Sequence, residues 1–127
     1  EREPPREKPT ISLLINCGFL EPEQNDTAVE ILRLFCEQAG YPFGSVLKVA
    51  SGEAILSTPF RFLVQRKVKR FARAVALGER LTLQVTMPLP KGVFLRASRS
   101  FWTQYGAKNG ITPEQMASLE IEDGKLP

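Results

Sequence analysis

The sequence predicts an α/β fold built on a parallel sheet, and three observations indicate it. Residues 11–15 form a short apolar run, typical of a strand that is buried on both faces. An amphipathic helix follows and ends at Gly40, after which residues 45–50 form a second apolar strand. A second amphipathic helix begins near Pro59 and ends at Gly78. Strand, helix, strand and helix in this order predict parallel strands joined by right-handed crossovers.

The first strand ends at Asn16, and the loop 16–21 that follows it is the first candidate site. Gly18 allows a sharp turn there, or a close approach of the backbone to a ligand. In open α/β sheets, ligands bind beyond the carboxyl ends of the strands, which is where this loop lies. The exit of the second strand, Ser51-Gly52-Glu53, is the second candidate for the same reason.

The first helix carries apolar residues at the spacing i, i+3, i+4, i+7, which predicts that one face packs against the sheet. Pro22 suits its first turn, and the acidic residues around it complement the positive end of the helix dipole. We interpret those carboxylates as helix-start residues rather than as an acid–base set. The apolar face consists of Ala28, Ile31, Leu32, Phe35 and Ala39.

The second helix is basic on the side opposite its apolar face. Such a cationic face can meet phosphate, nucleic acid or a membrane surface. It is more often solvated, and no aromatic residue lies among the cations for base stacking. The sequence therefore predicts neither a nucleic-acid partner nor a membrane partner. The apolar residues are Phe60, Val64, Val68, Phe71, Ala72 and Val75, and the cations are Arg61, Arg66, Lys67, Lys69, Arg70 and Arg73.

Composition excludes several classes of chemistry. The chain has no histidine, which removes His-based acid–base catalysis, Ser–His or Cys–His triads and His-ligated zinc. Cys17 and Cys36 are too few for a disulfide framework or a metal cluster, so we expect a reducing, cytoplasmic setting. No apolar run approaches the about 20 residues that a membrane-crossing helix needs.

The 127 residues suit one domain with a lead-in and an extension. Residues 1–9 are charged and rich in proline, which predicts a disordered linker. Residues 10–127 predict a single α/β domain, with a strand–helix–strand–helix core over 10–80 and a helical extension over 81–127. A helix expected over 96–107 carries Phe101, Trp102 and Tyr105, with Phe94 just before it. These aromatic residues predict a substrate or dimer surface, against the alternative of a core-capping helix.

Two parallel strands do not form a stable sheet alone. Three alternatives remain open from the residues. The alternating segment 81–87 joins the sheet, or copies of the chain pair with each other, or further strands belong to an absent N-terminal half.

The segment Asn16-Cys17-Gly18-Phe19-Leu20-Glu21, with Gln24-Asn25 and the helix spacing up to Gly40, resembles the second half of flavodoxin-like NAD(P)H-dependent flavin reductases. Trp102 and Lys108-Asn109-Gly110 are similar to their C-terminal element. The resemblance covers residues 10–119. It implies a flavodoxin-like three-layer parallel sheet, here incomplete, with FMN at the carboxyl ends of the strands. It also implies hydride transfer from NADH or NADPH to the flavin.

The resemblance further implies which residues hold the flavin, while catalytic residues remain unknown. The phosphate-binding loop of that family lies upstream, and nothing in this chain matches it. We therefore expect this segment alone to be inactive. Separately, we expect a homo-oligomer, because the proposed sheet is too small to bury every apolar surface. The implied flavin-binding residues are Asn16, Cys17, Gly18, Phe19, Glu21, Ser51 and Gly52.

Simpler interpretations stand beside these. The loop 16–21 can be an ordinary strand-to-helix connection in which Phe19 packs, and Cys17 can be a small buried hydrophobe rather than a reactive thiol. The alternative function is a non-catalytic α/β module that dimerises or binds a partner through its aromatic tail or its basic helix.

Overall fold

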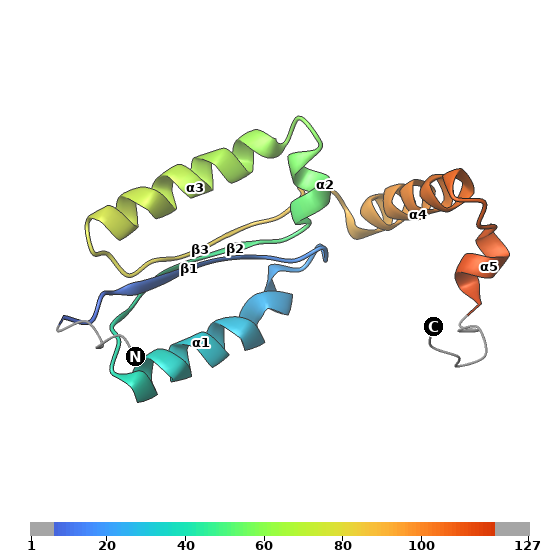
Figure 1. Ribbon diagram of the computed structural model, residues 1–127. Helices are drawn as coiled ribbons and strands as arrows, with labels where there is room; N and C mark the ends of the chain where they lie inside the picture. Colours follow the sequence, from blue (N-terminus) through green and yellow to red (C-terminus); the bar gives the residue numbers. More distant parts are fainter. Residues whose placement is uncertain (1–6, 119–127) are drawn as a thin grey trace. The chain divides into compact units, whose positions relative to one another are not determined.

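A computed structural model describes residues 7–118 of the protein. Residues 1–6 of the predicted linker and 119–127 of the predicted extension lie outside the described residues. The chain forms two compact units, Glu1–Pro88 and Leu89–Pro127 (Figure 1). The elements of the first unit are β1 (Ile11–Asn16), η1 (Pro22–Asn25), α1 (Asp26–Ala39), β2 (Phe43–Val49), α2 (Gly52–Leu56), α3 (Arg61–Ala76) and β3 (Thr82–Val85).

The first unit contains a three-stranded parallel sheet in the order β1-β2-β3. Leu47 at the middle of β2 lies in register between Leu14 of β1 and Leu83 of β3. The α/β class and the parallel sheet are therefore confirmed. Of the three alternatives for completing the sheet, the structure contains the first, because part of segment 81–87 forms β3.

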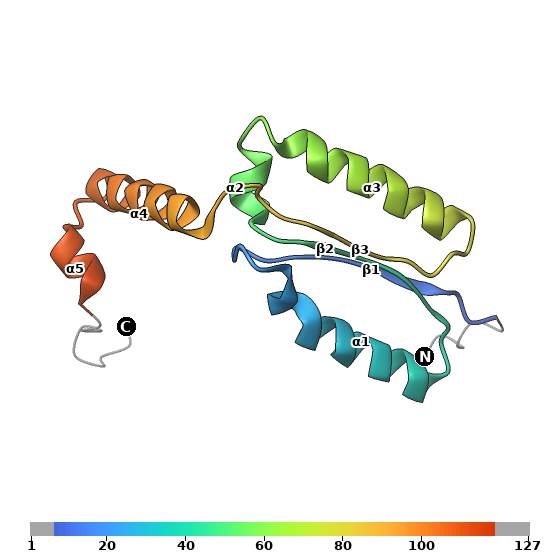
Figure 2. The ribbon, with the colours of Figure 1, turned by 180° about the vertical axis from the view of Figure 1, so that it is seen from behind.

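The sheet lies between two helices, so the unit has three layers (Figures 1 and 2). On β2, Lys48 points toward α1, because its ammonium group pairs with Asp26 at the start of that helix. Leu47 and Val49 point to the opposite face, which α3 covers. β3 is likewise buried on the α3 side and exposed on the α1 side.

The two crossovers between the strands have opposite hands. The strands follow one another in chain order, yet α1 and α3 cover opposite faces. Two right-handed crossovers in such a sheet would place both helices on one face, so that expectation is wrong for one connection. The side chains of β3 account for the placement of α3. Leu83 and Val85 offer an apolar surface on one face only, whereas Thr82 and Gln84 make the other face polar.

The core lies mainly where α2 and α3 cover β2 and β3. Ser45 is a buried polar residue near the start of β2, and its hydroxyl both donates and accepts a hydrogen bond. Its hydroxyl donates to the carbonyl of Glu79 at 2.7 Å and accepts from the amide of Leu81 at 3.1 Å. The buried apolar residues are Cys36, Val46, Leu47, Val49, Ala50, Ile55, Val64, Ala74, Leu83, Val85 and Met87.

Each long helix turns only part of its predicted apolar face toward the sheet. On α1, Cys36 is fully buried and Leu32 is half-buried, although Cys36 was not assigned to the apolar face. On α3, Val64 is buried. Three strands are too narrow to cover both apolar faces, so one side of each helix stays exposed. The exposed members are Ala28, Ile31, Phe35, Val68, Ala72 and Val75.

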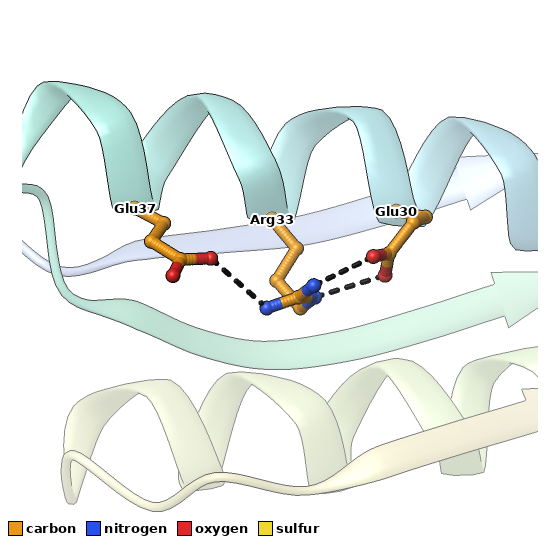
Figure 3. A network of polar contacts seen from close by, with 3 residues as sticks. All are labelled: Glu30, Arg33 and Glu37. Atoms are coloured by element: carbon orange, nitrogen blue, oxygen red, sulfur yellow. Dashed lines mark hydrogen bonds and ion pairs between the residues drawn. The ribbon is translucent and has the colours of Figure 1, made fainter.

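The outer surface of α1 carries a network of three charged side chains (Figure 3). Arg33 donates to both carboxylate oxygens of Glu30, at 2.9 and 2.6 Å, and to Glu37 at 3.3 Å. The hydrogen bond from Arg33 holds the pKa of Glu30 below its usual value. Because all three side chains are exposed at helical i, i+3 and i, i+4 spacing, the network supports the helix rather than forming a site.

The second unit pairs α4 (Lys91–Lys108) with the short α5 (Pro113–Ala117). The predicted capping box is confirmed: the hydroxyl of Thr112 accepts from the amide of Gln115, whose side chain accepts from the amide of Thr112. The aromatic helix begins at Lys91 rather than at residue 96, because Pro90 can start a helix.

Candidate functional site

Both candidate loops lie at the carboxyl edge of the sheet, and hydrogen bonds join them. The amide of Cys17 donates to the carbonyl of Val49 at 3.0 Å, and the amide of Gly52 donates back to the carbonyl of Cys17 at 3.0 Å. The amide of Ser51 donates to the carbonyl of Phe19 at 2.6 Å. Parallel strands end at the same edge, which is why segments 30 residues apart in the chain meet here. We call residues 16–21 and 50–52 together the loop pair.

The end of β3 also contributes to the loop pair, through Thr86. The hydroxyl of Thr86 donates to the carbonyl of Leu20, and it lies 3.5 Å from the hydroxyl of Ser51. The amide of Ala50 donates to the carbonyl of Val85 at 2.8 Å. Sequence reasoning missed Thr86, which lies within the alternating segment 81–87 and one residue past the end of β3.

The outer surface of the loop pair is open rather than packed. Phe19 is 61% exposed, and Asn16 and Gly18 are exposed as well. The backbone amides of Gly18, Phe19 and Leu20 donate no hydrogen bond to any residue that the structure describes. The simpler interpretation, in which Phe19 packs within a strand-to-helix connection, does not agree with this exposure. The loop therefore has an exposed ring and three N–H groups without an acceptor among the described residues.

The thiol of Cys17 is part of the scaffold of the loop. The side-chain amide of Asn25 in η1 donates to its sulfur at 3.3 Å. The thiol in turn lies 3.8 Å from the carbonyl of Phe19 and 3.9 Å from that of Glu21, both long contacts. Asn25 itself is buried, so this contact fixes the loop against η1. Over residues 7–118, no group of three His, Cys, Asp or Glu side chains could hold a metal ion.

Glu21 and Gly52 lie at the ends of the two segments of the loop pair. Glu21 is half-buried and immediately precedes η1. A Cβ at Gly52 would lie 3.4 Å from the Cβ of Asn16, so the ends of the two loops lie next to each other. The whole predicted set of site residues thus gathers in one place.

Ser51 holds the loop pair in an uncommon backbone conformation. Its φ of +53° and ψ of +33° lie in the left-handed region, where it is the one non-glycine residue among those described with positive φ. The side chain is buried. A serine costs about 1 kcal/mol in this conformation relative to glycine. Strain of this kind, held at a strand end, is typical of binding sites.

We expect the Ser51→Gly variant to be at least as stable as the wild type, with a gain of up to about 1 kcal/mol, because glycine adopts positive φ without strain. The Ser51→Val variant should lose more than about 2 kcal/mol, because β-branched residues resist this region. Urea unfolding followed by circular dichroism measures both. In a matched control, Ser57→Gly at an ordinary φ of −84° should lose stability. Loss of stability in both glycine variants would contradict the strain at Ser51.

The residues of the loop pair fit part of the cofactor that the resemblance implies. An exposed aromatic ring, the Asn16 amide and three unused N–H donors suit the edge of a flat, acceptor-rich ring such as that of a flavin. The chain contains no Gly-rich or Ser/Thr-rich loop for the phosphate of FMN. The fit therefore extends to the ring and not to the phosphate.

No helix in the described part of the chain is long and apolar enough to span a membrane. No protein-family model, no curated protein and no solved structure matches this chain.

Proposed function

We propose that this chain is the flavin-contacting part of an FMN-dependent NAD(P)H oxidoreductase of the flavin or quinone reductase type. One observation carries the proposal: Phe19 is exposed at the carboxyl edge of a parallel sheet, and the backbone amides of residues 18–20 donate no hydrogen bond to any described residue. Ligands of α/β proteins bind at this edge. The resemblance of residues 16–25 to flavin reductases suggests that the ligand at this edge is a flavin.

A bound flavin would supply the hydride chemistry, accepting from a nicotinamide and passing electrons to an acceptor. The chain's own residues would orient the ring. The amides of Gly18, Phe19 and Leu20 would donate hydrogen bonds to its oxygen and nitrogen atoms. The phenyl ring of Phe19 would lie against the flavin and exclude water from one side.

Because this chain has no phosphate-binding loop, we propose that the flavin ring and the phosphate of FMN are bound by two different parts of the parent protein. The chain would hold the ring, and a phosphate-binding part would supply most of the affinity for FMN. We therefore expect weak flavin binding by this chain alone and no reductase activity.

The test is a titration of riboflavin, lumiflavin and FMN with the protein, following flavin fluorescence. We expect quenching by all three, with dissociation constants that agree within about threefold, because no residue contacts the phosphate. The Phe19→Ala variant should weaken binding about 3- to 10-fold, because it removes a stacking surface.

The matched control is Phe62→Ala on α3, since Phe62 is also an exposed phenylalanine in the same unit. It should leave all three titrations unchanged. Absence of quenching by every flavin would overturn the proposed function. Much tighter binding of FMN than of lumiflavin would contradict the division between ring and phosphate.

A second candidate function is a non-catalytic interaction module, which the aromatic surface of α4 favours. Phe101, Trp102 and Tyr105 are all about half exposed, and their ring centroids lie 5.3 to 6.2 Å apart. Exposed aromatic clusters are typical of interface anchors. A protein that quenches no flavin, yet forms an oligomer that dissociates when Trp102 is replaced by alanine, would support this candidate.

A further inference from the structure

The two edges of the sheet differ in character. β1 has the sequence ISLLIN, with apolar side chains on both faces and no charge. β3 is shorter, and its exposed positions are the polar Thr82 and Gln84. Strands that are apolar on both faces are typical of the interior of a sheet, whereas short strands with polar residues are typical of edges. β1 therefore has the composition of an interior strand, although it lies at the edge of the sheet.

The outer edge of β1 has unpaired backbone groups. The amide of Cys17, just past the end of β1, donates toward β2, to the carbonyl of Val49. In a parallel pair, every second residue directs its N–H and C=O to the neighbouring strand. Leu14 and Asn16 therefore direct theirs outward. Among residues 7–118, no strand pairs with this edge.

Apolar side chains lie exposed around the same edge. Leu14 is 48% exposed, although Leu47, its register partner on β2, is fully buried on the same face. Ile31 of α1 is 64% exposed, and Phe35 is also exposed. Phe35 stacks on Tyr41, and Lys8 lies over the Tyr41 ring. Since Lys8 shortly precedes β1, this places the exposed side of α1 near the same strand.

We propose that the outer edge of β1 is the interface of a symmetric dimer of this chain, in which the two β1 strands pair antiparallel. A two-fold axis perpendicular to the sheet at Leu14 places Leu14 opposite the partner's Leu14, on the face that α3 covers. The same register places Leu13 opposite the partner's Ile15, on the face that α1 covers. Apolar residues then meet apolar residues on both faces, and the two sheets become one of six strands.

Charge favours a second copy at this edge over the other exposed apolar surfaces. A symmetric interface brings the same patch of both copies together, so a strand whose charges share one sign would repel its copy. β1 contains no charged residue. The exposed apolar side of α3 lies among five cations between Arg61 and Arg70, and α4 carries four cations without an acidic residue. Self-pairing through either helix would bring like charges together.

The test is sedimentation velocity of the full chain from about 1 to about 100 µM. We expect the wild type to sediment as a dimer of the 14.2 kDa chain at the upper concentrations. The Leu14→Lys and Leu14→Glu variants should each be monomers, with the dissociation constant raised on the order of a hundredfold, because two like charges then face each other. Mixing these two variants should restore a dimer, because opposite charges then meet.

The matched control is Phe62→Lys, because Phe62 is 48% exposed like Leu14 but lies on α3. It should dimerise as the wild type does. Circular dichroism checks that every variant is folded. A wild type that is monomeric at about 100 µM overturns the proposal. Failure of the mixed variants to dimerise overturns the register at Leu14. Flavin binding does not enter either readout.

Discussion

Replacing Leu47 by alanine is expected to lower the free energy of unfolding of the first unit by about 3 kcal/mol, within a range of about 2 to 5 kcal/mol. Leu47 is fully buried at the centre of the middle strand, between Leu14 and Leu83 in register and beneath α3. Its removal leaves a cavity that strands paired on both sides cannot close. A small domain has only about 5 to 15 kcal/mol of stability, so the loss is a large fraction of the total.

Urea unfolding followed by far-ultraviolet circular dichroism measures this loss. The matched control is Leu34→Ala on α1, where the leucine is exposed and the loss should stay below about 1 kcal/mol. Equal losses at the two positions would contradict the placement of β2 in the core.

The second large effect is expected at the ion pair between Lys48 and Asp26, which joins the middle strand to α1. The ammonium of Lys48 lies 2.6 Å from the carboxylate of Asp26. Lys48 is only 7% exposed, whereas the side chain of Asp26 is largely solvent-accessible. We expect Asp26→Asn to lower the free energy of unfolding by about 1 to 3 kcal/mol, because it leaves a buried ammonium without its counter-ion.

Substitution of the other partner of the ion pair, Lys48, should have a smaller effect on the free energy of unfolding. Lys48→Met keeps the aliphatic volume and removes the buried charge, so the free energy of unfolding should stay within about 1 kcal/mol of the wild type. The double variant Asp26→Asn with Lys48→Met should be no less stable than Asp26→Asn alone, because the stranded charge is gone. The exposed Arg33→Ala serves as the control and should change little. Stability that falls more for Lys48→Met than for Asp26→Asn would contradict this account.

The elements near the amino end could be predicted from the sequence because their signals are local. The apolar runs predict β1 and β2 to within two residues, and the helical spacing together with Gly40 predicts the end of α1. Gly52 and Glu53 were expected in the exit loop of the second strand. They begin α2 instead, which was not predicted because a helix of little more than one turn has no periodicity to detect.

The neighbours of each strand could not be predicted in the same way. The alternation in segment 81–87 indicates an extended chain but does not say which strand it pairs with, since parallel partners are distant in sequence. The same limit applies to the helix faces. Ile31 and Val68 carry the apolar pattern that predicts burial, yet both are exposed because the sheet that would cover them is too narrow.

The candidate site was predictable to a similar extent. The carboxyl-edge rule brought the loop after Asn16 and the loop after β2 together, and the structure joins them by hydrogen bonds. Thr86 could be found only once β3 was known to belong to the sheet. The left-handed backbone of Ser51 was not predictable, because serine as a residue type gives no signal of positive φ.

The apolar edge at β1 and the polar edge at β3 together limit the size of any assembly of this chain. A protein whose sheet can pair with other copies at both edges can add copies without limit and form fibres. Here the far margin is formed by four residues, two of them with hydrophilic side chains turned to solvent. Growth is thus possible in one direction only, and self-association would stop at a closed pair instead of continuing into a filament.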